Sequence, residues 1–279
     1  MIYSTARLSV MSSGDGQGFE TLESAEFEND DAEDSRMEAG LYTHKILYMG
    51  PRVPKLVRTL TPKDALMLDE KSWDCYPYSK TVYASNYFGK RFTMTVESMV
   101  VEDDRGEHPN ALNLPDDVLK IREVDYIDIV QDELPSGSVL DKGQTHPSTF
   151  QSKLTGRGPL KPEFEKTCEP TICIYKVVTV NLDFGPFQKK CESLAQSAGM
   201  RDLLLPFHQQ VFCWIDDWFP MTIEEVRAYE KECFDKLNKA QFPHQKGKPH
   251  ELKQGEEVAR VKQEDYLDSP SASPMPGKK

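Results

Sequence analysis

The sequence has no uninterrupted apolar run of the roughly eighteen residues that a membrane-spanning helix requires, so it predicts no such helix. Its N-terminal segment lacks the apolar core of a secretion signal, and we therefore expect a cytoplasmic protein. It also lacks an excess of basic residues: 34 Lys and Arg stand against 46 Asp and Glu, giving a formal net charge of −12. Because affinity for phosphate backbones comes from clustered Lys and Arg, this balance argues against a nucleic-acid-binding protein.

Motifs of catalysis and metal binding are missing as well. None of the six cysteines forms a C-x-x-C pair, which argues against a zinc site or a disulfide framework and favours buried free thiols. The chain has no G-x-S-x-G, Walker or H-E-x-x-H motif and no evident acid–base pair. We therefore expect no catalytic residue, no metal and no cofactor, and a binding protein rather than an enzyme.

The chain does contain enough apolar residues for a sizeable core, 38% of its 279 residues. Segments rich in β-branched and aromatic residues precede a long helical region, which predicts an α+β fold with a curved antiparallel sheet around helices. The expected strands cover residues 41–49, 75–88, 91–101, 122–131 and 171–182. One expected helix covers about 187–218, with interruptions near Gly199 and Pro206. Another begins at Thr222, where T-x-x-E forms a capping box, and continues to about residue 240.

Four segments are expected to be irregular. Residues 14–40 are rich in Gly, Asp and Glu, which predicts a mobile acidic loop. Residues 51–59 contain two prolines and predict a turn. The Gly- and Pro-rich residues 134–167 predict a long excursion that would cover one mouth of the domain. Residues 241–279 are polar and predict a disordered tail, which leaves residues 1–240 as the folded domain.

Two charged residues fall within apolar rows. Lys176 shares one face of its strand with Ile172, Ile174, Val178 and Val180, and Glu230 lies in an apolar stripe of the last helix. Because a buried unpaired charge is costly, each needs a partner or water. One interpretation is an ion pair between the two, or a Lys176 that extends to solvent. The other is that both face a cavity, where Lys176 meets an anion and Glu230 accepts hydroxyl protons.

Polar residues on the other expected strands are compatible with such a cavity. Thr43 and Lys45 share one strand face, Ser79 and Thr81 share another, and Ser98 continues a row of apolar residues. Each is weak evidence alone, because Ser and Thr are ordinary residues in sheets.

At these positions the sequence resembles the class I phosphatidylinositol transfer proteins, from about residue 1 to residue 240. The matching runs, in the same order as in that family, are LYTHKI (41–46), EKSWDCYPYSKTV (70–82), YIDI (126–129), FQSKLTGRGPL (150–160), YKVVTV (175–180), FHQQVFCWIDDW (207–218) and MTIEEVRAYE (221–230). The resemblance implies a helix-grip fold, in which a curved sheet and two long helices enclose one phospholipid in a closed tunnel.

The resemblance also implies a set of headgroup-binding residues in this chain. They are Thr43, Lys45, Asp74, Thr81, Ser98, Lys176 and Glu230, with Ser79 beside the headgroup. At Asp74 the family has asparagine; a carboxylate accepts inositol hydroxyls but would repel a nearby phosphate. Ser98 replaces a threonine, and Ser79 replaces a cysteine.

Three further positions follow from the resemblance. A tryptophan pair that docks the family on membranes is replaced near Phe184 and Phe187, which would insert more weakly or belong to a plain turn. Ser152 matches a position that is phosphorylated in the family. The alternative is that Ser152 is an ordinary exposed serine in a loop. Family members also carry a first strand before the region that matches Met1, so we expect this chain to lack that strand.

The expected function is therefore transport of a single phospholipid, phosphatidylinositol or alternatively phosphatidylcholine, between membranes. The protein would be a cytoplasmic monomer that binds membrane surfaces transiently. The alternative is a lipid sensor or adaptor that binds a lipid without transferring it.

Overall fold

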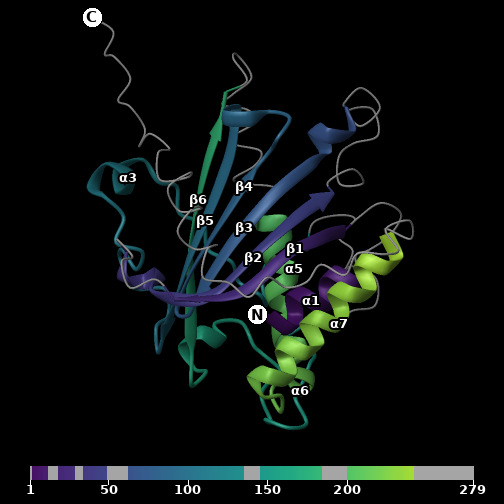
Figure 1. The fold of residues 1–279 in the computed structure, drawn as a ribbon. Helices are drawn as coiled ribbons and strands as arrows, with labels where there is room; N and C mark the ends of the chain where they lie inside the picture. The colour runs from purple at the N-terminus through teal and green to yellow at the C-terminus, as the bar shows by residue number, and fades with distance from the viewer. Residues whose placement is uncertain are drawn as a thin grey trace, which may run out of the picture.

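The computed structural model describes residues 2–11, 18–28, 34–48, 62–134, 145–183 and 200–241. Its centre is one curved six-stranded sheet in the order β1-β2-β3-β4-β5-β6, with every neighbouring pair antiparallel (Figure 1). The strands are β1 (Gly18–Glu28), β2 (Ala39–Tyr48), β3 (Met67–Cys75), β4 (Tyr78–Ala84), β5 (Phe92–Glu102) and β6 (Ile172–Leu182). The expected α+β class with a curved antiparallel sheet is confirmed.

Three of the described α-helices lie on one side of this sheet (Figure 1). The α-helices are α1 (Ile2–Met11), α3 (Asp116–Ile121), α5 (Met200–Cys213), α6 (Ile215–Trp218) and α7 (Ile223–Gln241). Short 3₁₀ turns are η1 (Ser35–Met37), η3 (Lys63–Leu66), η4 (Gly89–Arg91) and η5 (Phe164–Lys166). Figure 1 shows α1, α5 and α7 gathered on the same side of the sheet, where α7 contacts both α1 and β1.

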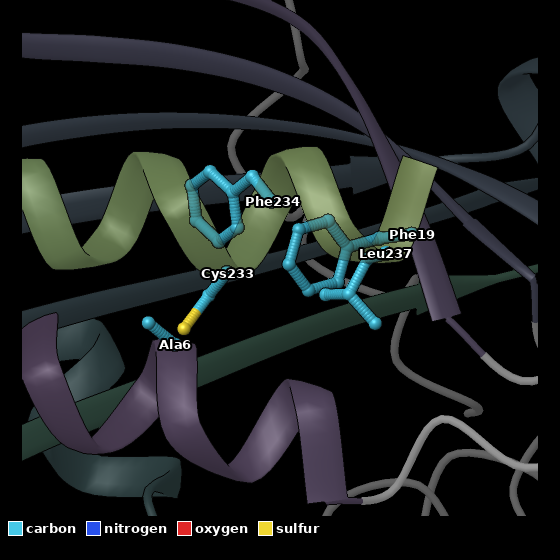
Figure 2. Close-up of a cluster of buried hydrophobic side chains, with 5 residues drawn as sticks. All are labelled: Ala6, Phe19, Cys233, Phe234 and Leu237. Atoms are coloured by element: carbon cyan, nitrogen blue, oxygen red, sulfur yellow. The ribbon is translucent and has the colours of Figure 1, made fainter. Parts of the chain in front are cut away.

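A buried cluster attaches the helices to the sheet. It contains Ala6 of α1, Phe19 of β1, and Cys233, Phe234 and Leu237 of α7 (Figure 2). The Phe19 and Phe234 rings meet edge to face, with centroids 5.0 Å apart. We call the face of the sheet that carries Phe19 the helix face.

The opposite, outer face is covered by loops instead of long helices. There, Cys75 and Tyr78 form a second buried cluster with Met37 of η1 and Leu112 of the segment before α3. Both faces of the sheet are therefore packed. This packing determines which residues of each strand point to the helix face and which point to the outer face.

The structure corrects the predicted acidic loop at residues 14–40. Residues 18–28 form β1, which pairs with β2 along its length apart from an irregularity between Thr21 and Glu23. The acid content obscured the strand, although Phe19 is buried against α7 while Glu26 and Glu28 are exposed.

A second correction concerns residues 122–131, which were predicted as a strand and form irregular chain with a turn. The Asp128 carboxylate accepts the backbone N–H groups of Val130 and Gln131 at 2.8 and 3.0 Å. Such local hydrogen bonds satisfy the backbone within the turn and compete with a strand ladder. Conversely, β3 was not predicted, because MLDEKSWDC carries four charged residues.

The helical predictions are confirmed at the described residues, with one correction. The Thr222 backbone N–H donates to Glu225 at 2.8 Å and the Glu225 N–H donates to Thr222 Oγ1 at 3.3 Å, which is the expected capping box of α7. Pro206 does not interrupt α5 but lies inside it. Residues 184–199, the turn at 51–59 and the tail from 242 onwards lie outside the described residues.

Replacing Leu237 by alanine should lower the free energy of unfolding by roughly 2–5 kcal/mol, because its side chain is 2% exposed in the cluster between α1, β1 and α7. Urea unfolding measures the change. Leu203→Ala, at an exposed position of α5, is the control and should have a much smaller effect. Equal losses in the two variants would contradict the packing of α7 described above.

Candidate functional site

The strand register gathers the predicted headgroup residues of the sheet on the helix face. Lys45 belongs to this face, because its Nζ lies 5.3 Å from the Phe19 ring centroid and 5.1 Å from that of Phe234. Side chains two residues apart on a strand, and directly paired side chains on neighbouring strands, point to the same side of a sheet. Three rows of paired residues follow: Leu41–Asp74–Ser79–Ser98–Lys176, Thr43–Ser72–Thr81–Val96–Val178 and Lys45–Glu70–Tyr83–Met94–Val180.

Lys176 lies at the β6 end of the first row. Its Nζ donates to Ser98 Oγ at 2.9 Å, and burial lowers the pKa of the ammonium group. Glu230 instead accepts a hydrogen bond from Arg227 at 3.1 Å. The interpretation of Lys176 and Glu230 as an ion pair is therefore wrong for this structure. A partly buried cation whose partner among the described residues is a hydroxyl suits an anionic ligand.

The second row is a line of hydroxyl groups. Thr43 is buried on β2, and Ser72 Oγ and Thr81 Oγ1 on β3 and β4 are hydrogen-bonded to each other at 2.8 Å. Ser72 was not identified from the sequence, because it lies on the strand that the sequence did not predict. The row offers both donors and acceptors, so it is suited to a polar group with hydroxyls.

The third row contains an ion pair. Lys45 Nζ lies 3.5 Å from Glu70 Oε1, and both side chains are largely buried. The two phenylalanine rings cover the other side of the ammonium group, where cation–π attraction stabilises it. Lys45 thus has a carboxylate partner within the protein, unlike Lys176, which is held by a hydroxyl.

At the β3 end of the first row, Arg227 of α7 lies between two carboxylates. Its guanidinium is 3.1 Å from Glu230 and 3.9 Å from Asp74. Sequence reasoning missed Arg227; its position one helical turn before Glu230 was the available signal. Gly40 supports this corner, since a Cβ at that position would lie 2.3 Å from the Asp74 carbonyl oxygen.

The cationic and the carboxylate ends of the first row are well separated. Asp74 and Lys176 are three strand spacings apart, about 14 Å along the row at roughly 4.8 Å per spacing. The replacement of asparagine by Asp74 therefore does not put a negative charge beside an anion bound at Lys176. The first row therefore presents a cationic group at one end and a carboxylate near the other.

His208 of α5 is a further titratable group near this face that the sequence did not single out. Burial, with the charge of Lys176 second, lowers its pKa from 6.5 to about 4. His208 is therefore neutral near pH 7 and adds no positive charge to the Lys176 end.

Ser152 was weighed as a phosphorylated or an ordinary exposed loop residue, and the second expectation is wrong. Ser152 is only 2% exposed, and its hydroxyl donates to the Asp216 carboxylate of α6. The same carboxylate accepts the N–H groups of Lys153 at 2.8 Å and Leu154 at 3.2 Å. These bonds fasten residues 152–154 to α6, so a kinase would reach Ser152 only after this loop opened.

The remaining predictions concern features at the edges of the described structure. Phe184 and Phe187, the predicted membrane-docking residues, lie outside the described residues. The five described cysteines are free thiols, of which Cys75, Cys213 and Cys233 are buried. Within the described segments, none of the helices combines the length and the apolar composition needed to cross a membrane.

Comparison with known proteins gives one consistent family. A family model described as phosphatidylinositol transfer protein matches residues 1–235. Phosphatidylinositol transfer protein 4 of Dictyostelium discoideum is 37% identical over 233 residues, 83% of this chain and 68% of that protein. Phosphatidylinositol transfer protein 2 of the same organism is 37% identical over 239 residues, covering 85% and 88%. Cytoplasmic phosphatidylinositol transfer protein 1 of Drosophila melanogaster is 36% identical over 231 residues, covering 83% and 81%.

Acidification should destabilise the protein through His208. Between pH 6.5 and about 4 the unfolded state takes up a proton that the folded state excludes, so stability falls as the pH falls across this interval. The total loss from this residue is up to about 3 kcal/mol. Urea unfolding at several pH values should show a shallower fall for His208→Gln than for the wild type; identical slopes would refute this role.

Introducing a carboxylate at residue 152 should unfasten the loop from α6. Ser152→Glu places a negative charge against Asp216 and removes the hydroxyl that Thr155 Oγ1 donates to at 2.7 Å, so we expect a loss of about 2–3 kcal/mol in stability. Ser148→Glu, at an exposed position of the same excursion, is the matched control and should change stability by less than about 0.5 kcal/mol. A Ser152→Glu variant as stable as its control would show that the contact to Asp216 is dispensable.

Proposed function

The chain belongs to the phosphatidylinositol transfer protein family, and from that premise we propose that it binds a single phospholipid between sheet and helices and carries it between membranes. Phosphatidylinositol is the proposed cargo, with phosphatidylcholine as a second lipid that uses the same site. The relatives are named as transfer proteins, and we propose that this chain likewise acts as a carrier, without catalysis or a cofactor.

The observation that carries this proposal is the arrangement of the helix face. Seven positions proposed to contact or adjoin a headgroup, which come from five different strands, lie in three adjacent rows of one face: Thr43, Lys45, Asp74, Ser79, Thr81, Ser98 and Lys176. The eighth, Glu230, comes from the helix that packs on this side. A purely structural sheet would not require so many polar groups under its helices, since buried polar groups cost free energy unless a partner satisfies them.

Each end of the first row has a proposed role. Lys176 and Ser98 bind the phosphate, because a lowered-pKa ammonium regains stability beside an anion. Asp74 and Glu230 accept hydrogen bonds from inositol hydroxyls. Thr43, Lys45 and Thr81 complete the polar wall between them, and Ser79 adjoins it. Phosphatidylcholine shares the phosphate and the acyl chains but carries a quaternary ammonium group in place of the inositol ring and its hydroxyls.

Delivery requires contact with a membrane, and we propose that it is transient. The protein acts as a monomer in the cytoplasm in this proposal, and the Drosophila relative is named as a cytoplasmic phosphatidylinositol transfer protein. Phe184 and Phe187 remain the proposed docking residues. Once the lipid is enclosed, its acyl chains leave water, which stabilises the complex by about 0.8 kcal/mol for each buried methylene.

Transfer of labelled lipids between vesicles tests the function directly. Wild-type protein should transfer phosphatidylinositol and, more slowly, phosphatidylcholine. Lys176→Met should lower the transfer of both lipids by at least about tenfold, because both carry the phosphate and a charged hydrogen bond is worth roughly 1.5–3 kcal/mol. Lys80→Met, on the outer face of β4, is the control and should transfer like the wild type.

Two results would reject the proposal. A wild-type protein that transfers neither lipid is not a carrier, and native mass spectrometry would then show whether it still retains a lipid as a sensor would. A Lys176→Met variant that transfers both lipids as fast as the wild type would show that Lys176 does not bind the phosphate.

A further inference from the structure

Arg227 joins two carboxylates that come from different parts of the fold. Its Nη1 lies 3.1 Å from Glu230 on the same helix, and its Nη2 lies 3.9 Å from Asp74 on β3. The guanidinium therefore connects α7 to the polar row of the sheet at the end opposite Lys176.

Stability alone gives a weak reason for this arrangement. The side chains of Arg227 and Asp74 are 33% and 43% exposed, and ion pairs with this exposure contribute only about 0–1 kcal/mol to folding. Glu230 is the buried member, at 15% exposure, and it is the one with the shorter contact. The guanidinium of Arg227 thus holds the less exposed carboxylate, that of Glu230, in place. The more exposed carboxylate, that of Asp74, also interacts with the positive charge of Arg227.

The charge balance of the three groups has a consequence for the ligand. Two carboxylates and one guanidinium leave a net charge of −1, whereas without Arg227 the same corner would carry −2. A cationic group would be attracted more strongly to the −2 corner, and a hydroxyl-bearing neutral group would gain nothing from the extra charge.

We propose that Arg227 is a positioning residue that sets the headgroup selectivity of the site. It holds Glu230 as an acceptor for a polyhydroxylated headgroup, and its charge offsets one of the two negative charges of Glu230 and Asp74, so that a quaternary ammonium headgroup is not favoured. This inference rests on the proposed function.

The chemistry of the two candidate headgroups makes the effect measurable. An inositol ring presents several O–H donors and no charge of its own beyond the phosphate, so it needs aligned acceptors. A choline group presents a positive charge and no N–H or O–H donor, so it responds to net charge and not to alignment. Loss of Arg227 should therefore weaken one lipid and spare or favour the other.

The experiment measures the ratio of phosphatidylinositol to phosphatidylcholine transfer in four variants. Arg227→Met should lower the ratio about tenfold, mainly through phosphatidylinositol, since one well-aligned charged hydrogen bond accounts for a change of that size. Arg227→Lys should fall in between, because an ammonium group keeps the charge without the fork geometry. Asp74→Asn combined with Arg227→Met returns the corner to −1, so any gain in phosphatidylcholine transfer should disappear, whereas phosphatidylinositol transfer should stay low because Arg227 still does not hold the acceptor.

The matched control is Arg105→Met. Arg105 is 32% exposed and forms an ion pair with Glu169 at 3.4 Å, in the segment that connects β5 to β6. Its replacement therefore removes an exposed arginine–carboxylate ion pair, as the replacement of Arg227 does. It should leave the ratio unchanged. Thermal unfolding of every variant verifies that the ratios compare folded proteins.

Three results would overturn the inference. If Arg227→Met lowers the transfer of both lipids equally, Arg227 binds the shared phosphate. If the ratio stays at the wild-type value, it has no role in selectivity. If the double variant transfers as much phosphatidylcholine as Arg227→Met and more than the wild type, the arginine does not act through the net charge of this corner. In each of these cases the wild type still transfers lipid, whereas a wild type without transfer defeats the proposed function itself.

Discussion

The polar face of this protein depends on the hydrogen-bonded register of β2 to β6. Side chains alternate along a strand, so a slip of one residue would turn Asp74 or Lys176 to the outer face. That face is already occupied, because Tyr78 and Cys75 pack there against Met37 and Leu112. Packing on both faces of the sheet therefore fixes the strand register. With this register, the side chains of the polar rows can point only to the helix face.

Within those rows, charge is distributed unevenly. Lys45 is neutralised by Glu70 beneath two phenylalanine rings, and Arg227 is shared between two carboxylates, whereas Lys176 has a hydroxyl as its hydrogen-bond partner. Among the described basic residues of the polar rows, Lys176 is thus the one whose charge a phosphate would offset. As a member of the phosphatidylinositol transfer protein family, the chain combines this cation with an acceptor-rich corner about 14 Å away along the sheet.

Sequence reasoning succeeded where a polar residue interrupts a regular apolar pattern. Lys176 and Glu230 were singled out in this way and are partly buried, while their contact with a headgroup stays a prediction. The capping box of α7 followed from spacing alone and is confirmed. Sequence reasoning failed where the structure depends on partners distant in sequence. Ser72 was missed because β3 is rich in charges and is stabilised as a strand by pairing with β2 and β4. Arg227 was missed because its role appears only when α7 lies beside Asp74.

The connection between β5 and β6 differs from every other link in the sheet. The first five strands follow one another as neighbours, but residues 103–171 separate β5 from β6 before the two strands pair. Loop-closure entropy rises with the length of the closed segment, so this pairing is the one with the greatest entropic barrier. The meander of β1 to β5 can form first from local contacts, and β6 adds Lys176 to its edge afterwards. This order of assembly makes the Lys176 end of the polar rows the last part of the helix face to be completed as the chain folds.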